Sequence, residues 1–329
     1  MPTTQYDAAL DLSLHVMRSD AATRRKVQKI LKKLEQELLA KLSRGNLTEW
    51  GKARLTKQLL DSRQLIADNY REISDLTKEA SEAVSAVAGA ATTAALALAH
   101  AESSLPTRAV LDQLARGAVV QGAVQGRWWK RQADNTRWKY EQAVKQGIAN
   151  SETNQQIIQR VRRELDVTRK SAATLVQTSM QTVMNNARTA TFELNKDIIK
   201  GYRAVTALDG KVCPECIPLA DLEWDKNFNP IGHGRPMPNY PLHFNCRCVI
   251  VPIVIDGPQG GQRASDEGPV KASLTFEKFL ERKGDKYQND VLGVGRAELW
   301  RKGKITLQDL TTGTNQPLSL KRLREKYAS

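Results

Sequence analysis

Apolar residues recur every three or four positions through the N-terminal part of the chain. Between residues 22 and 42 they form one row with lysines and arginines opposite: Val27, Ile30, Leu31, Leu34, Leu38 and Leu42. After the turn-forming residues 43–46 a second row follows: Leu55, Leu59, Ile66, Tyr70 and Ile73. Such spacing keeps apolar side chains on one face of an α-helix. The pattern predicts two amphipathic helices joined as an antiparallel hairpin.

The segment 83–99 consists mainly of alanine, interrupted by Gly89, Thr92 and Thr93. A helix that spans the hydrocarbon core of a bilayer needs roughly 20 predominantly apolar residues. The segment is shorter and only weakly apolar, so we expect a helix that packs against protein. Insertion into a membrane is the alternative. The N-terminus has no basic stretch followed by an apolar run, so we expect no signal peptide.

Residues 106–200 also carry a mainly helical pattern. A short helix is expected over 107–116, and the glycine-containing stretch 118–132 is expected to be irregular before helix resumes at Trp138. Asn150 and Ser151 are expected to cap the next helix, and a long helix is expected over about 171–196.

At Gly201 the pattern changes to β-branched and aromatic residues. Residues 202–208 predict a strand followed by a tight turn at Asp209 and Gly210. The apolar run 249–255 predicts a second strand, and Pro252 within it favours an edge position. Residues 257–272 have the composition of a linker, and residues 273–329 return to short helical pieces.

The chain of 329 residues carries 50 basic and 36 acidic side chains, a net charge of +14. This excess favours polyanionic partners such as nucleic acid, although solvated lysine-rich helix faces would give the same count. Trp128, Trp129 and Trp138 lie among arginines and lysines. We expect them to be core anchors of a helical hairpin, with a nucleic-acid stacking patch as the alternative.

Four cysteines, at 213, 216, 246 and 248, cluster with His243. Two residues between Cys213 and Cys216 let the backbone turn so that both thiolates face one ion. We therefore expect a zinc site in a chain that folds in a reducing compartment, with disulfides as the minor alternative. The small module around the site has few core residues, so a closed structural ion is expected rather than a catalytic one.

Five donors compete for the four positions of a tetrahedral zinc ion. Cys213 and Cys216 form one pair. For the other pair we favour His243 and Cys246, because these two residues lie on one turn. A site made of the four cysteines is the main alternative.

Enzyme motifs give little support for catalysis. The sequence lacks HExxH, GxSxG and GxxxxGK[ST], and no His-x-Glu precedes Cys213 as in zinc deaminases. A nuclease of the His-Asn-His type remains an alternative, carried by His233, His243 and Asn245. We expect a protein that is not an enzyme.

LDGKVCPEC, followed by PLHFNCRC and an apolar strand, resembles the phage Mu F-like minor head proteins, the phage head-morphogenesis family. The flanking segments WKYEQAVKQGIANSETNQQIIQRVRRE and TFEKFLERKGDKYQNDVLGVGRAELWRKGKITLQDL are also similar to that family, so the resemblance extends over about 120–325. One departure is His-Phe-Asn where the family usually has His-Pro-Asn. The metal ligands that the resemblance implies are Cys213, Cys216, His243, Cys246 and Cys248.

The resemblance implies a minor structural protein of a tailed-phage virion, acting in head assembly at the capsid interior near the portal after a cytoplasmic stage in the host. The implied partners are the portal protein, other capsid or head proteins and packaged DNA through non-specific phosphate contacts. Ejection with the DNA and contact with a host membrane are further expectations. The alternative function is a zinc-dependent nuclease or a DNA-binding protein active during packaging.

The expected fold class is mainly α with a small α+β zinc-stapled module, an extended helical N-terminal region and a short helical C-terminal tail. The expected divisions are a helical hairpin with the Ala-rich helix (1–105), a helical domain of the head-morphogenesis type (106–200), a zinc-binding β module (201–256), a linker (257–272) and the tail (273–329).

Overall fold

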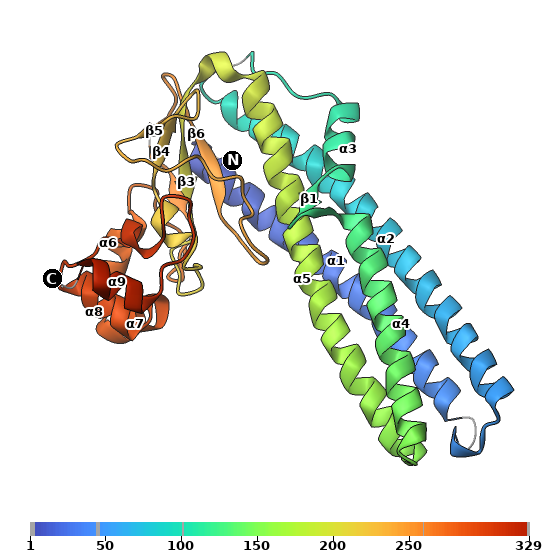
Figure 1. Cartoon of the computed structure of the whole chain (residues 1–329). Helices are drawn as coiled ribbons and strands as arrows, with labels where there is room; N and C mark the ends of the chain where they lie inside the picture. Colours follow the sequence, from blue (N-terminus) through green and yellow to red (C-terminus); the bar gives the residue numbers. More distant parts are fainter. Residues whose placement is uncertain (1–3, 44–46, 101, 259, 328–329) are drawn as a thin grey trace. The chain divides into compact units, whose positions relative to one another are not determined.

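A computed structural model describes residues 4–43, 47–100, 102–258 and 260–327 (Figure 1). The described chain is mainly helical, with small sheets between residues 119 and 271. Its α-helices are α1 (Gln5–Leu42), α2 (Lys52–Leu96), α3 (Arg108–Arg116), α4 (Gln125–Ala149), α5 (Asn154–Leu194), α6 (Phe276–Glu281), α7 (Asp285–Leu292), α8 (Val294–Arg301) and α9 (Leu320–Tyr327). Short 3₁₀ turns occur at η1 (Leu47–Glu49), η2 (Lys196–Ile198), η3 (Ile217–Leu219) and η4 (Leu307–Leu310).

The chain divides into two compact units that cut across the sequence order. Unit 1 comprises Met1–His15, Ser85–Leu111 and Met184–Ser329. Unit 2 comprises Val16–Val84 and Asp112–Val183. The long helices α1, α2 and α5 therefore contribute residues to both units. The five divisions expected from the sequence are consecutive ranges of the chain, and they stay a prediction.

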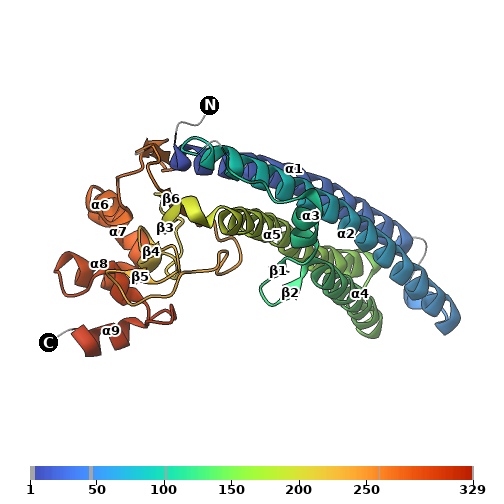
Figure 2. The same ribbon diagram turned by 90° about the horizontal axis from the view of Figure 1, so that it is seen from above.

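Unit 2 is built from long helices that lie side by side (Figure 2). The expected apolar rows form its interior: Val27, Leu31, Leu34, Leu38, Leu42, Leu59, Ile66, Tyr70 and Ile73 are all buried. The two amphipathic helices predicted at 22–42 and 55–73 are confirmed as parts of α1 and α2. The turn expected at 43–46 falls largely outside the described residues.

The starts of two helices, α4 and α5, differ from the sequence expectation for local reasons. Residues 118–132 are not irregular: β1 (Val119–Val120) and β2 (Ala123–Val124) form a tight hairpin closed by Gly122 at φ 85°, and α4 begins at once at Gln125. Asn150 ends α4 instead of starting the next helix. That helix is α5, a single helix over Asn154–Leu194 rather than two, and Thr153 caps it.

Thr153 and Gln156 form a reciprocal cap at the start of α5. The amide of Gln156 donates to Thr153 Oγ1 at 3.3 Å, and the amide of Thr153 donates to Gln156 Oε1 at 2.8 Å. Two amides that have no partner inside the helix are satisfied in this way. The capping pair, rather than the earlier Asn150 and Ser151, therefore sets where α5 begins.

The three tryptophans of α4, Trp128, Trp129 and Trp138, differ in how deeply they are buried. Trp129 is 1% exposed, and its Nε1 donates to Thr77 Oγ1 at 2.8 Å. Trp138 is 60% exposed. Trp128 is part-buried, and its Nε1 donates to the carbonyl of Val120 at 2.6 Å. The expectation of core anchors is confirmed for Trp129 and is wrong for Trp138.

Gly147 lets α4 and α5 approach closely, and it gives a first test of the packing. A Cβ added at Gly147 would lie 2.4 Å from Cγ1 of Ile157, whereas one added at Gly126 would meet nothing within 4 Å. We expect Gly147→Ala to destabilise the protein by about 1–3 kcal/mol through overpacking. Gly126→Ala, the control in the same helix, should be neutral or stabilising by up to about 1 kcal/mol. Urea unfolding followed by circular dichroism measures both, and equal effects would contradict this packing.

Unit 1 contains a four-stranded antiparallel sheet in the order β5-β4-β3-β6 within the described residues. The strands are β3 (Ile199–Val205), β4 (Glu223–Asp225), β5 (Pro230–Ile231) and β6 (Val249–Val254). The two predicted strands are confirmed as β3 and β6, and β6 lies at the sheet edge as Pro252 indicated. A Cβ at Gly201 would lie 2.5 Å from the carbonyl oxygen of Trp224, so glycine permits the close approach of β3 and β4.

The C-terminal helices share one hydrophobic core with this sheet. Residues from α6 to α9 are buried together with sheet residues, and they include Phe276, Phe279, Leu292, Leu310, Leu323, Trp224 and Ile250. Arg235, 8% exposed, binds this region through its guanidinium. Its Nη1 donates to Thr311 Oγ1 at 2.7 Å, to the carbonyl of Thr312 at 2.9 Å and to Asn315 Oδ1 at 2.8 Å. The predicted short helices of the tail are therefore packed against the sheet.

The stretch expected to be a linker makes specific contacts within unit 1. It contains β7 (Gln262–Arg263) paired with β8 (Val270–Lys271). Arg263 is 2% exposed, forms an ion pair with Asp221, and donates through Nη2 to the carbonyl of Thr206 at 2.8 Å. The glycine-rich composition of this stretch indicates a flexible backbone. It does not indicate that one side chain in the stretch, Arg263, is buried.

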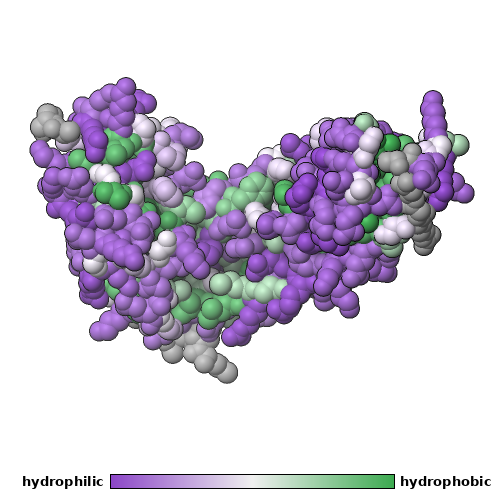
Figure 3. All heavy atoms as spheres, turned by 90° about the horizontal axis from the view of Figure 1, so that it is seen from below, coloured by the Kyte–Doolittle hydropathy of each residue, from purple (hydrophilic) through white to green (hydrophobic). Residues whose placement is uncertain are grey.

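Charged and polar residues dominate the face drawn in Figure 3, with smaller apolar areas between them. The Ala-rich segment forms the last turns of α2, where Val84, Ala88, Ala95 and Leu96 are buried. Within the described ranges, no helix combines the length and the apolarity that crossing a membrane requires.

Candidate metal centre

Two tight turns in unit 1 bring the predicted ligands together. Cys213 and Cys216 lie between β3 and β4, where the amide of Cys216 donates to the carbonyl of Cys213 at 2.9 Å. His243 and Cys246 precede β6, and the amide of Cys246 donates to the carbonyl of His243 at 3.2 Å. Each turn therefore presents two donors, and the sheet brings the two turns together because β3 pairs with both β4 and β6.

The donors form two groups that share Cys216. In one group Cys213 and Cys216 accompany His243, and in the other Cys216 accompanies Cys246 and Cys248. Within each group the donor atoms lie no more than 4.8 Å from one another. Cys216 Sγ is 3.3 Å from His243 Nε2 and 3.8 Å from Cys246 Sγ, and Cys213 Sγ is 3.7 Å from His243 Nδ1. The structure thus brings all five predicted donors together.

These separations fit a tetrahedral zinc ion. With zinc–sulfur bonds of about 2.3 Å, two thiolates on one ion lie roughly 3.8 Å apart. The distance between the sulfurs of Cys216 and Cys246 has this value. Cys216, Cys246 and Cys248 are buried, and Cys213 is half-buried, so water has little access to the sulfurs. The donor set and its burial suit a closed structural site.

The position of Cys248 does not exclude it as a ligand. Residues two apart on a strand point to the same face, and β6 begins only at Val249. Cys246 and Cys248 both lie in the irregular segment before it, and both sulfurs join the same group. His243 and Cys248 therefore stay alternative fourth ligands.

When no metal is bound, the electrostatics favour thiolate at Cys213 and Cys246 beside imidazolium at His243, whereas hydrogen bonds and burial raise the pKa of Cys216 and Cys248. The Cys216 thiol and then His243 lower the pKa of Cys213 to about 5. Hydrogen bonds with Cys213 and Cys246 raise the pKa of His243 to about 11. A hydrogen bond from Cys216 also lowers the pKa of Cys246. Deprotonated sulfur is the form that binds a metal ion.

Neighbouring side chains hold the ligands in place. Arg247, between the two cysteines, donates to both carboxylate oxygens of Asp209 at 2.7 and 2.8 Å. His243 Nδ1 lies 2.8 Å from the carbonyl of Phe244, a bond that fixes the ring. Tyr240 is buried in the same core as the cysteines, and its hydroxyl has no hydrogen-bond partner.

The nuclease alternative depends on His233, whose ring nitrogens are both engaged by backbone. His233 Nε2 lies 2.8 Å from the carbonyl of Glu223, and Nδ1 accepts from the amide of Arg235 at 3.2 Å. His233 does not join the cysteine cluster in the part of the chain that the structure describes. Hydrogen bonds on both ring nitrogens fix the orientation of His233, and the nuclease alternative based on His233, His243 and Asn245 stays a prediction.

Residues 134–251 match the family model described as phage Mu protein F like protein. This part of the chain is phage Mu F-like. The match begins within α4, includes α5 and ends within β6, so it contains every predicted metal ligand. It is narrower than the resemblance seen in the sequence, because the C-terminal helices lie outside it. No curated protein and no solved structure matches the chain.

This match connects residues 134–251 with the bacteriophage head-morphogenesis proteins. The family is structural, which is consistent with the expectation of a protein that is not an enzyme.

Several buried residues of unit 1 were not identified by sequence reasoning. Arg188, Arg235 and Arg263 are at most 8% exposed, and Tyr240 is 3% exposed. The one available signal was at Arg188, which follows the buried Met184 by one helical turn. Arg235, Tyr240 and Arg263 lie in irregular or short-strand segments without a period, so no pattern distinguished them from surface residues.

Proposed function

We propose that this chain is a minor structural protein of a tailed-phage virion that acts in head assembly, in contact with the portal and inside the capsid. The observation that carries the proposal is the phage Mu F-like match over residues 134–251. The matched region contains the long α5 and the two turns that carry the cysteine cluster. Long helices suit lateral contacts with the helices of neighbouring head proteins.

We further propose that a structural zinc ion joins the two ligand-bearing turns. Cys213, Cys216 and Cys246 would bind it, with His243 as the fourth ligand and Cys248 as the alternative. The His243 ring is held by the Phe244 carbonyl, which supports its use. The ion would fix the geometry of the sheet without taking part in a reaction.

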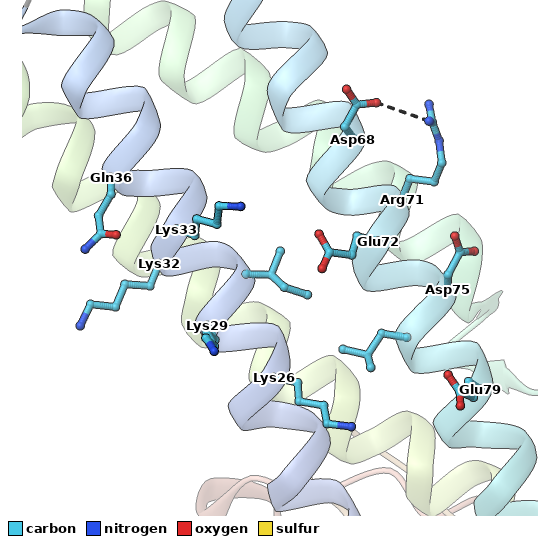
Figure 4. A pocket seen from close by; sticks show the side chains of 12 residues that line it. Lys26, Lys29, Lys32, Lys33, Gln36, Asp68, Arg71, Glu72, Asp75 and Glu79 are labelled. Carbon is cyan, nitrogen blue, oxygen red and sulfur yellow. Dashed lines mark ion pairs between the residues drawn. The ribbon is translucent and has the colours of Figure 1, made fainter.

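Packaged DNA is proposed as a non-specific contact, because a net charge of +14 attracts phosphate without sequence reading. One row of lysines is not a good candidate for this contact. Lys26, Lys29, Lys32 and Lys33 of α1 line a groove of about 1000 Å³, but Asp68, Glu72, Asp75 and Glu79 of α2 line it too (Figure 4). These carboxylates would repel a phosphate backbone. Contact with DNA would therefore use other basic surfaces.

Quantitative mass spectrometry of purified proheads and mature virions tests the structural proposal. We expect the protein in both particles at a few copies per portal ring, with cross-links to portal subunits. Its absence from both particles would overturn the proposal. Comparison of full particles with particles that have ejected their DNA shows whether the protein leaves with the genome.

A further inference from the structure

A buried positive charge in unit 1 lacks a described counter-charge. Arg188 of α5 is 4% exposed. Its Nη2 donates to the carbonyl of Ile250 at 2.7 Å, but Nε and Nη1 have no hydrogen-bond partner. No carboxylate of the described residues pairs with it, and burial alone lowers the pKa of Arg188 to about 10. An unpaired charge is costly to bury, so a compensating group is expected at this position.

Arg188 lines a small cavity where segments from α1, α2, α5 and β6 meet. Gln5 Nε2 and Thr92 Oγ1 belong to lining residues as well, and neither atom has a hydrogen-bond partner. Gln5 and Thr92 are 6% and 5% exposed. The other lining side chains are alanine, leucine, phenylalanine and proline. The cavity is thus lined mainly by apolar side chains, and three of its lining residues carry buried nitrogen or oxygen atoms that lack a partner among the described residues.

The hydrogen-bonding groups of Arg188, Gln5 and Thr92 indicate what kind of ligand the cavity can bind. Guanidinium and amide N–H groups only donate, and the Thr92 hydroxyl can donate too. Such a set suits an acceptor with a negative charge. The cavity leaves about 10 Å³ for the centre of a water-sized particle, so it holds one small particle and excludes phosphate, sulfate or a carboxylate side chain. A water molecule would fit the space but would leave the charge of Arg188 uncompensated.

We propose that this cavity binds a single halide ion, chloride in the cell, held by Arg188 together with Gln5 and Thr92. The ion neutralises the buried guanidinium and bonds to donors from α1, α2 and α5. It therefore fastens the N-terminal turn of α1 to the remainder of unit 1. This site is separate from the cysteine cluster, and it does not depend on the proposed function.

Thermal unfolding in chloride and in gluconate at equal ionic strength tests the proposal. At a chloride concentration about tenfold above Kd, we expect Tm to rise by roughly 2–4 °C relative to gluconate. Hydrogen exchange of residues 5–12 should slow in chloride. A crystal grown in bromide should show an anomalous peak in the cavity. Equal Tm values in the two salts, or a bromide map without this peak, would overturn the proposal.

Two variants separate the buried site from general salt effects. Arg188→Met removes the charge with little change of shape, and the chloride dependence should disappear. Arg63→Met removes an arginine whose side chain is 44% exposed, and the dependence should persist. Chloride dependence retained in Arg188→Met would contradict the site. If Arg188→Met does not fold, the two-salt comparison and the bromide map on the unmodified protein still decide the question.

Discussion

The Cys216→Ala variant should lose the bound metal and unfold the sheet of unit 1. Cys216 belongs to both groups of donors, so its loss affects the site whichever residue is the fourth ligand. A structural zinc ion contributes on the order of 10 kcal/mol to the folding of a small module. The C-terminal helices share the core of this sheet, so their packing should be lost too. Elemental analysis measures the metal, and fluorescence of the buried Trp224 follows unfolding.

Glu215→Gln is the matched control, because it changes a neighbouring side chain of the same turn and leaves every thiol in place. It should retain zinc and fold normally. Treating the unmodified protein with a zinc chelator should reproduce the unfolding seen in Cys216→Ala. Correctly folded protein without metal, or a chelator-treated protein with unchanged stability, would refute the structural zinc ion while leaving the virion proposal untouched.

The same measurement chooses between the alternative ligands. We expect His243→Ala to lose zinc and Cys248→Ala to retain most of it. The reverse result would identify a site made of four thiolates, which the position of Cys248 before β6 permits. Comparable loss from both variants would show that neither residue is dispensable.

Trp129→Ala should be the most damaging single change in unit 2. The side chain is 1% exposed, and its ring lies 6.5 Å from that of Tyr70. Truncation of a buried tryptophan leaves a large cavity and costs about 3–5 kcal/mol. The hydroxyl of Thr77 would also lose its donor. Equilibrium unfolding in urea measures the loss.

Trp138→Ala is the control from the same helix. Trp138 is 60% exposed, so the stability should change by less than about 0.5 kcal/mol. The variant also tests the stacking alternative, because Trp138 is the tryptophan of this group that a nucleic acid can reach. A weakened affinity for single-stranded DNA with unchanged stability would favour that alternative. Similar destabilisation by the two substitutions would show that the assignment of core and surface is wrong.

Local patterns in the sequence determined much of this protein. The apolar rows of α1 and α2 and the strand at 249–255 are recognisable because neighbouring residues alone set a helical or extended period. The cysteine cluster was also predictable, because two close pairs of cysteines and a histidine favour a shared metal site. The family resemblance followed from the same residues.

Tertiary structure decided the features that depend on residues far apart in the chain. The close passage of α4 and α5 at Gly147, the anchoring of the C-terminal helices by Arg235 and the unpaired burial of Arg188 each arise where distant segments meet. A side chain's burial depends on what covers it, and a linear pattern does not contain that information. The same reason applies to the choice of the fourth ligand: His243 and Cys248 both lie beside the other donors only because pairing of β3 with β4 and β6 brings their segments together.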